Sequence, residues 1–248
     1  MIRHLSVARS SSHGAEPAEA SRAVRLLAVS DEAERAFDFQ SNRNALKPID
    51  AILGAGDLKP EYLDFLANAF NVPLLYVLGN HDRGGGWQEE RHHVPEPMDG
   101  DWHEVGGLRI CGLSWPTDKG ERAIHDQNAA WRQIGAGFLR TRGHRPEIVV
   151  SHVPPLGVGD APDDHYHRGF AAYKWFMDRS KPVLWVHGHT PLAATDKWWL
   201  RSGATTVVNV TGAVLIEVSP KGPNDQAAGD ERGAGEESTD RATAVAAR

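Results

Sequence analysis

The sequence of 248 residues predicts an α/β fold, and two observations indicate it. Short apolar runs typical of buried strands alternate along the chain with segments of helical periodicity. Five of these runs are followed directly by polar residues, as expected of strands whose carboxyl ends line one ligand site. The five polar clusters are Ser30-Asp31, Gly56-Asp57, Gly79-Asn80-His81-Asp82, Ser151-His152 and Gly188-His189.

A β-α-β unit is expected in the first half of the chain. Buried strands are predicted at 25–29, 51–53 and 74–78, and a helix at 60–70 begins with proline in its first turn. One face of this helix is apolar at helical spacing, so we expect it to pack on the sheet. That face carries Tyr62, Leu63, Leu66, Ala69 and Phe70.

A second sheet is expected to begin with a hairpin of strands 102–105 and 108–113. The paired glycines Gly106-Gly107 supply the positive φ angles of its tight turn. A final hairpin is predicted from strands 205–210 and 213–218, with its turn at Thr211-Gly212. The other elements expected are helices at 128–140 and 170–178 and strands at 147–150 and 183–186.

Composition predicts one domain, at residues 22–218, between two disordered segments at 1–21 and 219–248. The single cysteine, Cys111, lies in a strand-like run and is expected to be a buried thiol, which fits a reducing cytoplasm. No apolar run is long enough for a transmembrane helix and no signal-peptide core is found, so we expect a soluble cytoplasmic protein without membrane contact.

Charge argues against an extended nucleic-acid partner. The formal net charge is −6, and the chain has neither a basic stripe nor an arginine-rich run. A small phosphoester is therefore the expected substrate, whereas the oligomeric state does not follow from the sequence.

The tetrapeptide Gly79-Asn80-His81-Asp82 carries the most specific chemistry. An amide oxygen, an imidazole and a carboxylate placed together suit a metal-bound phosphate. In this interpretation Asn80 coordinates the metal, His81 moves a proton, and Asp82 orients the imidazole. Four residues alone carry a false-positive risk, which the other four strand-end clusters reduce.

The five clusters, in this order, resemble the motifs of the calcineurin-like metallophosphoesterase family over residues 22 to about 218. The resemblance implies a β-sandwich of two mixed sheets flanked by helices, in four αββα layers, with a two-metal site at one end of the strands. By position, Asp31 would bind the first metal and Asp57 would bridge both metals. The second metal would be held by Asn80, His152 and His189, with His81 and Asp82 as the catalytic pair.

Two departures from the family pattern fall on the first metal. Ala33 and Pro191 stand where the family usually has histidines. Removing both imidazoles should weaken this metal unless water, Glu32 or Glu34 replaces them. We therefore expect one tight divalent metal and a second, weaker one, with Mn, Fe or Zn suited to these ligands. The first motif, Ser30-Asp31-Glu32, also resembles a bacterial sub-branch that lacks this histidine.

The resemblance implies a metal-dependent phosphoric ester hydrolase that cleaves a small phosphomonoester or phosphodiester. Metal-activated hydroxide would attack phosphorus while His81 acts as general acid. The alternative is a catalytically weak or inactive scaffold, because the metallophosphoesterase-like subunit of retromer uses this fold as a binding surface. A scaffold has no physical reason to keep His81 and Asp82. A dinucleotide site at Gly54-Ala55-Gly56 is disfavoured because the third glycine of that motif is missing.

Three further residues are candidates for supporting roles. His187 lies two residues before His189, so it is either a second metal ligand or, in the favoured interpretation, a residue that supports the ligands. His167 lies in a polar loop that either contacts substrate or metal, or forms the exposed entry to a helix. Arg83, directly after the tetrapeptide, is a candidate for substrate contact.

Overall fold

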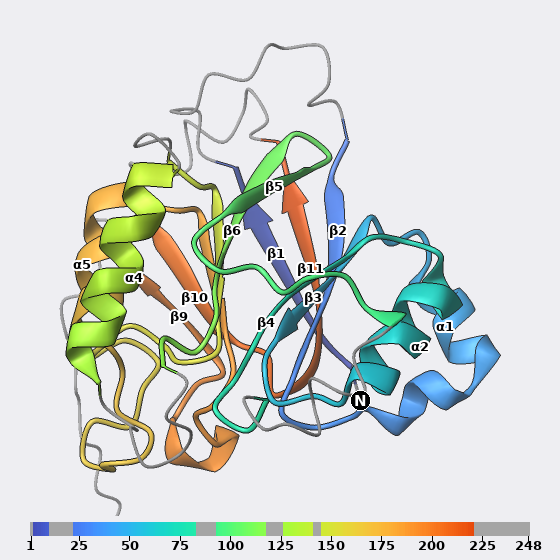
Figure 1. The fold of residues 1–248 in the computed structure, drawn as a ribbon. Helices are drawn as coiled ribbons and strands as arrows, with labels where there is room; N and C mark the ends of the chain where they lie inside the picture. The colour runs from blue at the N-terminus through green and yellow to red at the C-terminus, as the bar shows by residue number, and fades with distance from the viewer. Residues whose placement is uncertain (1, 10–21, 83–92, 118–125, 141–144, 221–248) are drawn as a thin grey trace, which may run out of the picture.

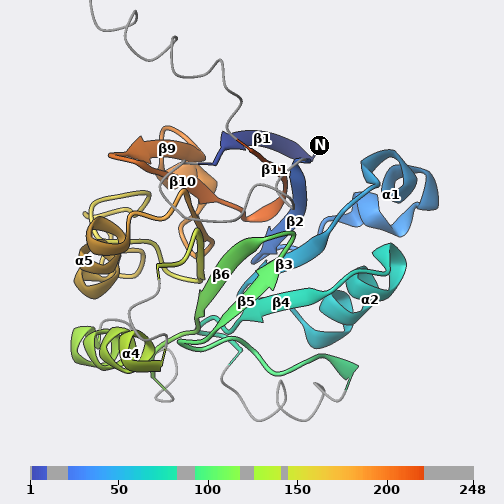
Figure 2. The same ribbon diagram turned by 90° about the horizontal axis from the view of Figure 1, so that it is seen from above.

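The computed structural model describes residues 2–9, 22–82, 93–117, 126–140 and 145–220. Two mixed β-sheets pack face to face, with helices on both outer surfaces (Figure 1). Figure 2 shows the same four layers from above. The expected αββα architecture is thus confirmed.

The first sheet has five strands and contains the expected β-α-β unit. Strands β2, β3 and β4 run parallel, β11 is antiparallel to β2, and β1 is parallel to β11. The helices α1 (Gln40–Leu46) and α2 (Pro60–Phe70) lie on its outer side (Figure 1). In order across the sheet the strands are β1 (Arg3–Ala8), β11 (Gly212–Ser219), β2 (Val24–Ser30), β3 (Ala51–Ala55) and β4 (Leu74–Val77).

The second sheet has six strands. Its parallel centre, β6, β7, β8 and β10, is bordered by the antiparallel edge strands β5 and β9. The helices α4 (Gln127–Arg140) and α5 (Ala171–Ser180) cover its outer face (Figure 1). Its strands in order are β5 (Trp102–Val105), β6 (Leu108–Leu113), β7 (Ile148–Ser151), β8 (Leu184–His187), β10 (Thr205–Asn209) and β9 (Trp199–Ser202).

Burial explains why the central strands of both sheets have continuous apolar sequences. There both faces of the sheet are covered, so side chains pointing either way are removed from water. One apolar cluster fills the space between the sheets, a second lies between the first sheet and α2, and a third lies under α4 and α5. On α2, Leu63, Leu66 and Phe70 are buried as the helical periodicity predicts.

The expected final hairpin is wrong. Residues 205–210 and 213–218 do form strands, but β10 belongs to one sheet and β11 to the other. Residues 209–211 therefore cross between the sheets, and the antiparallel neighbour of β10 is β9. The residues of the turn fit a hairpin as well as a connection between two sheets. Because β10 and β11 are buried on both faces, their apolar sequences do not show which sheet each strand joins.

The N-terminal segment also differs from the expectation of disorder over residues 1–21. Arg3–Ala8 forms β1, which pairs with β11 and buries Leu5 and Val7 between the sheets. The alternation of polar and apolar residues in this short run is a strand pattern. The polar composition of the rest of residues 1–21 favoured a prediction of disorder over this strand pattern. The predicted tail beyond Ser219 and residues 10–21 lie outside the described residues, apart from Pro220.

Two short 3₁₀ helices, η1 (Arg35–Asp38) and η4 (Leu192–Ala194), follow β2 and β8. Among the described helices, none combines the length and apolar composition that a membrane span requires.

Candidate metal centre

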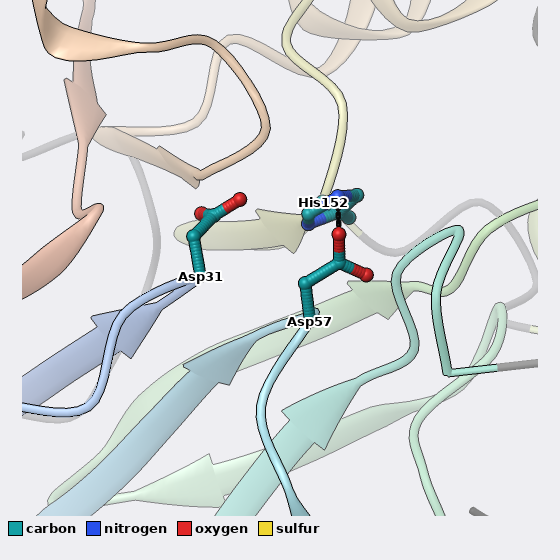
Figure 3. A group of neighbouring side chains, drawn as sticks. All are labelled: Asp31, Asp57 and His152. Carbon is teal, nitrogen blue, oxygen red and sulfur yellow. Dashed lines mark ion pairs between the residues drawn. The ribbon is translucent and has the colours of Figure 1, made fainter.

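The predicted site residues come together where the two sheets meet at one end of the sandwich. Asp31 directly follows β2, and Asp57 follows β3 after one glycine. His152 follows β7 on the opposite sheet, and its ring reaches the end of β3. Figure 3 shows these three side chains gathered from three strand ends.

Three of the predicted ligands have left-handed backbone conformations. The φ angles are 59° at Asp31, 57° at Asp57 and 64° at His189. Residues other than glycine rarely adopt positive φ, and such residues gather at functional sites where the surrounding structure holds them.

Asp57, Asn80 and His152 form the closest group of donor atoms. His152 Nε2 lies 3.2 Å from Asp57 Oδ2 and 3.0 Å from Asn80 Oδ1. Figure 3 shows the imidazole and the Asp57 carboxylate directed at each other. When His152 is neutral, each of these three atoms offers a lone pair to a cation.

The ring of His152 is oriented by the backbone of the facing sheet. Its Nδ1 atom lies 2.8 Å from the carbonyl oxygen of Ala55, to which it donates a hydrogen bond. In the neutral ring the lone pair is therefore on Nε2, which faces Asp57 and Asn80. A backbone carbonyl that fixes the tautomer in this way is typical of metal-binding histidines.

The charges in this group are strongly coupled. Complete burial lowers the pKa of His152, but the Asp57 carboxylate outweighs burial and raises the pKa to about 9. Burial likewise opposes ionisation of Asp57, and the facing imidazolium overcomes it, so the pKa of Asp57 is lowered. The group therefore favours a positive charge at its centre, which a proton or a metal ion supplies.

Asp31 completes a group of three that fits a metal ion. One ligand atom from each of Asp31, Asp57 and His152 lies within 4.8 Å of the others, and Asn80 Oδ1 adjoins them. Two carboxylates, an imidazole and an amide oxygen suit Mn, Fe and Zn. Among the described residues, Glu32 and Glu34 do not join this group. Glu34 instead accepts a hydrogen bond from the Ala36 amide at the start of η1.

His189 adjoins the group without belonging to it. Its ring centroid lies 4.9 Å from that of His152, and its Nε2 donates to the carbonyl oxygen of Tyr166 at 2.7 Å. Burial lowers the pKa of His189 to about 3, so the ring is neutral and its lone pair is on Nδ1. Its backbone amide contacts both carboxylate oxygens of Asp31, at 3.1 and 3.2 Å.

The predicted catalytic pair is arranged differently from the expectation. The Asp82 carboxylate accepts hydrogen bonds from the backbone amides of Asp57 and Gly79, at 2.7 and 2.8 Å. Within the described residues it makes no hydrogen bond to the imidazole of His81. Burial raises the pKa of Asp82 to about 6. Asp82 therefore ties the loops after β3 and β4 together.

His81 lies at the rim of the group. Its side chain is 62% exposed, and its Nε2 is 3.9 Å from Asp57 Oδ2. Its backbone amide donates to Asp57 Oδ1 at 3.0 Å. A histidine in this position is accessible to a substrate that contacts the metal group.

The supporting candidates have separate environments. His187 is buried, and burial lowers its pKa to about 4. Its Nε2 lies against Gly159, where an added Cβ would approach to 2.7 Å. His167 packs its ring 5.2 Å from that of His189, and its Nδ1 lies 2.5 Å from Asp164 Oδ2. Arg83 lies outside the described residues.

Two glycines allow the loops to approach this closely. A Cβ at Gly79 would lie 2.0 Å from Asp57 Oδ1, and one at Gly188 would lie 2.3 Å from Asp31 Oδ2. Both glycines belong to the strand-end motifs, so the sequence pattern already indicated that they lie at the site.

One contributor to the site was missed by sequence reasoning. The hydroxyl of Thr211 donates to Asp31 Oδ2 at 3.2 Å. The sequence indicates only a turn at this residue. No local signal reveals its role, because it reaches Asp31 only through the crossover between the sheets.

The family model of calcineurin-like phosphoesterases matches residues 24–193, which is more than half of the chain. The chain therefore belongs to the calcineurin-like phosphoesterase family. The match includes every predicted ligand but excludes β1, β9, β10 and β11. No curated protein sequence matches the chain significantly.

One solved structure shares the fold at low sequence identity, and two others are reported for comparison. One crystal structure, 17% identical, has a TM-score of 0.54 and covers 77% of this chain and 91% of its own. The protein TT1561 of Thermus thermophilus is 15% identical over 76% of this chain and 89% of its own, with a TM-score of 0.47. A conserved predicted phosphoesterase of Streptococcus pneumoniae is 13% identical over 81% and 77%, with a TM-score of 0.34.

Proposed function

We propose that this protein is a metal-dependent hydrolase of a small phosphomonoester or phosphodiester. The observation that carries the proposal is the convergence of Asp57 Oδ2, Asn80 Oδ1 and His152 Nε2 within hydrogen-bonding distance at the sheet edge. Family membership supports the reaction class. The cytoplasmic location and the absence of a nucleic-acid partner stay predictions.

Asp57, Asn80 and His152 would hold the tight divalent cation, with His189 alongside, and Asp31 together with Asp57 would hold the weaker one. Mn, Fe or Zn suits this donor set. When bound, such an ion supplies a Lewis acid that polarises a phosphoryl oxygen and makes water a stronger nucleophile. The absence of imidazoles at Ala33 and Pro191 favours one tight ion and a weaker second one.

The chain's own residues perform the remaining tasks. His81 is exposed at the rim and would hold a proton for the departing alkoxide. Asp82 fixes the positions of Asp57 and Gly79 through their backbone amides, and so fixes the base of the loop that carries Asn80 and His81. Ala55 holds the ring of His152 with Nε2 directed at the metal position.

Leaving-group dependence tests the role of His81. A poor leaving group needs a proton, whereas nitrophenolate departs without one. His81→Ala should therefore reduce turnover of an alkyl phosphate by about 100-fold to 10,000-fold, and much less that of p-nitrophenyl phosphate. The control is His103→Ala, which removes an exposed histidine of β5 that pairs with Asp101. Equal losses on both substrates would contradict the proton-donor role.

Metal content and turnover, measured together, distinguish the hydrolase from the scaffold alternative. The purified protein would be assayed for bound metal and for Mn-dependent hydrolysis of p-nitrophenyl phosphate and its bis ester. Turnover that depends on Mn and on His152 supports the hydrolase. Tight metal binding without turnover of either ester would favour the scaffold.

A further inference from the structure

The crossover between the two sheets contacts two of the loops at the metal group. Residues 209–211 connect the end of β10 to the start of β11. Asn209 Nδ2 donates to the carbonyl oxygen of Thr190, next to His189, at 2.6 Å. Thr211 donates through its hydroxyl to Asp31 Oδ2 at 3.2 Å. The crossover thus joins the loop after β2 to the loop after β8.

The Asp31 carboxylate is held by one residue of its own strand and by two residues from elsewhere in the chain. Its Oδ2 contacts the hydroxyls of Thr211 and Ser30, and both carboxylate oxygens contact the amide of His189. The contact to Ser30 is local, and a glycine at 188 leaves room for the His189 amide. Of the side chains described around this carboxylate, only that of Thr211 comes from beyond the family-matched residues. Oδ1 keeps a lone pair for a cation.

The position of Thr211 is itself fixed by the crossover and by β1. The Asn209 side chain accepts a hydrogen bond from the Thr211 amide at 3.0 Å. The guanidinium of Arg3 donates to the carbonyl oxygens of Asn209, at 3.0 Å, and of Thr211. Arg3 also lies over the ring of Trp198, 5.1 Å from its centroid. These contacts therefore fix residues 209–211, which place the Thr211 hydroxyl against Asp31.

We propose that Thr211 is a positioning residue that fixes the Asp31 carboxylate for metal binding. The inference rests on the proposed metal-dependent function. Both histidines that the family usually places at the first metal are missing, at Ala33 and Pro191. Asp31 then depends more on its hydrogen-bond partners for orientation. Partners of this kind typically change metal affinity about 10-fold to 100-fold when they are lost.

The test measures Mn²⁺ affinity by calorimetry on the full chain. Thr211→Val keeps the branched shape but removes the donor, and should lower the affinity of the weak Mn²⁺ component, which Asp31 binds, about 10-fold to 100-fold. Thr211→Ser keeps the hydroxyl and should bind Mn²⁺ like the wild type. Thr211→Ala removes the hydroxyl without adding a methyl group, so it replaces Thr211→Val if that variant folds poorly.

Thr205→Val is the matched control. It removes a buried hydroxyl that donates to the carbonyl oxygen of Pro182 at 2.7 Å, away from the metal group. An unchanged Mn²⁺ affinity in Thr211→Val, or an equal loss in Thr205→Val, would overturn the inference and leave the hydrolase proposal intact. A wild-type chain that binds no Mn²⁺ would instead overturn both.

Discussion

His152 Nε2 lies 3.2 Å from Asp57 Oδ2, and the histidine side chain is fully buried. Without a metal, this contact is an ion pair, because the carboxylate raises the pKa of His152 to about 9 despite the burial that opposes it. A cation bound at this position would take the place of the proton on Nε2. Metal binding and proton release are therefore linked at this pair.

Binding of the tight Mn²⁺ ion at pH 7.5 should release about one proton. At that pH a histidine whose pKa is about 9 is protonated, and coordination requires its neutral form. Calorimetry in buffers of different ionisation enthalpy measures the released protons. The release should fall as the pH rises through about 9, and a release that is absent at pH 7.5 would contradict the assignment of His152 as a ligand.

The stoichiometry of metal binding should reflect the two missing histidines. We expect the wild type to show one tight and one weak Mn²⁺ component. The double variant Ala33→His, Pro191→His restores the usual family residues at both positions and should tighten the weak component. Two equally tight ions in the wild type would refute the expectation.

Gly79→Ala should abolish tight metal binding. The added Cβ would lie 2.0 Å from Asp57 Oδ1, so the carboxylate must move. Gly135→Ala is the matched control, because its Cβ on α4 meets no atom within 4 Å. We expect this control to bind metal normally and to gain up to about 1 kcal/mol of unfolding free energy. Normal metal binding by Gly79→Ala would show that Asp57 is free to shift.

Arg9→Met should destabilise the fold by about 3 kcal/mol, because it deprives a buried carboxylate of its closest cation. Arg9 Nε lies 2.5 Å from Glu147 Oε1, and the Glu147 side chain is 1% exposed. Urea unfolding measures the change. Arg22→Met, which removes the exposed partner of Asp50, should leave the midpoint nearly unchanged. Equal midpoints for the two variants would show that the N-terminal segment contributes little through Glu147.

Cys111 should resist alkylation in the folded protein. Burial raises the pKa of its thiol to about 12, so almost no thiolate exists at pH 8. Iodoacetamide labelling followed by mass spectrometry should show modification only after denaturant is added. Rapid labelling of the native protein would contradict the burial of this strand.

The strand-end motifs were readable from the sequence because each motif is local to one strand. Asp31, Asp57, Asn80 and His152 do converge, as five clusters at successive strand ends indicate. The role of Asp82 was not predictable. Its partners are backbone amides, and the sequence does not show which amides face a given carboxylate.

The sequence by itself determined the α/β class, the β-α-β unit, the apolar face of α2 and the ligand types, since periodicity and strand-end polarity depend on neighbouring residues. The four-layer architecture was implied only by the family resemblance. Only the tertiary structure decided that β10 and β11 lie in different sheets, that β1 joins the first sheet, and that Thr211 meets Asp31. These contacts join residues as far apart in the sequence as Arg3 and Val214. They follow from how the buried faces of the two sheets pack together, and no local pattern encodes that choice.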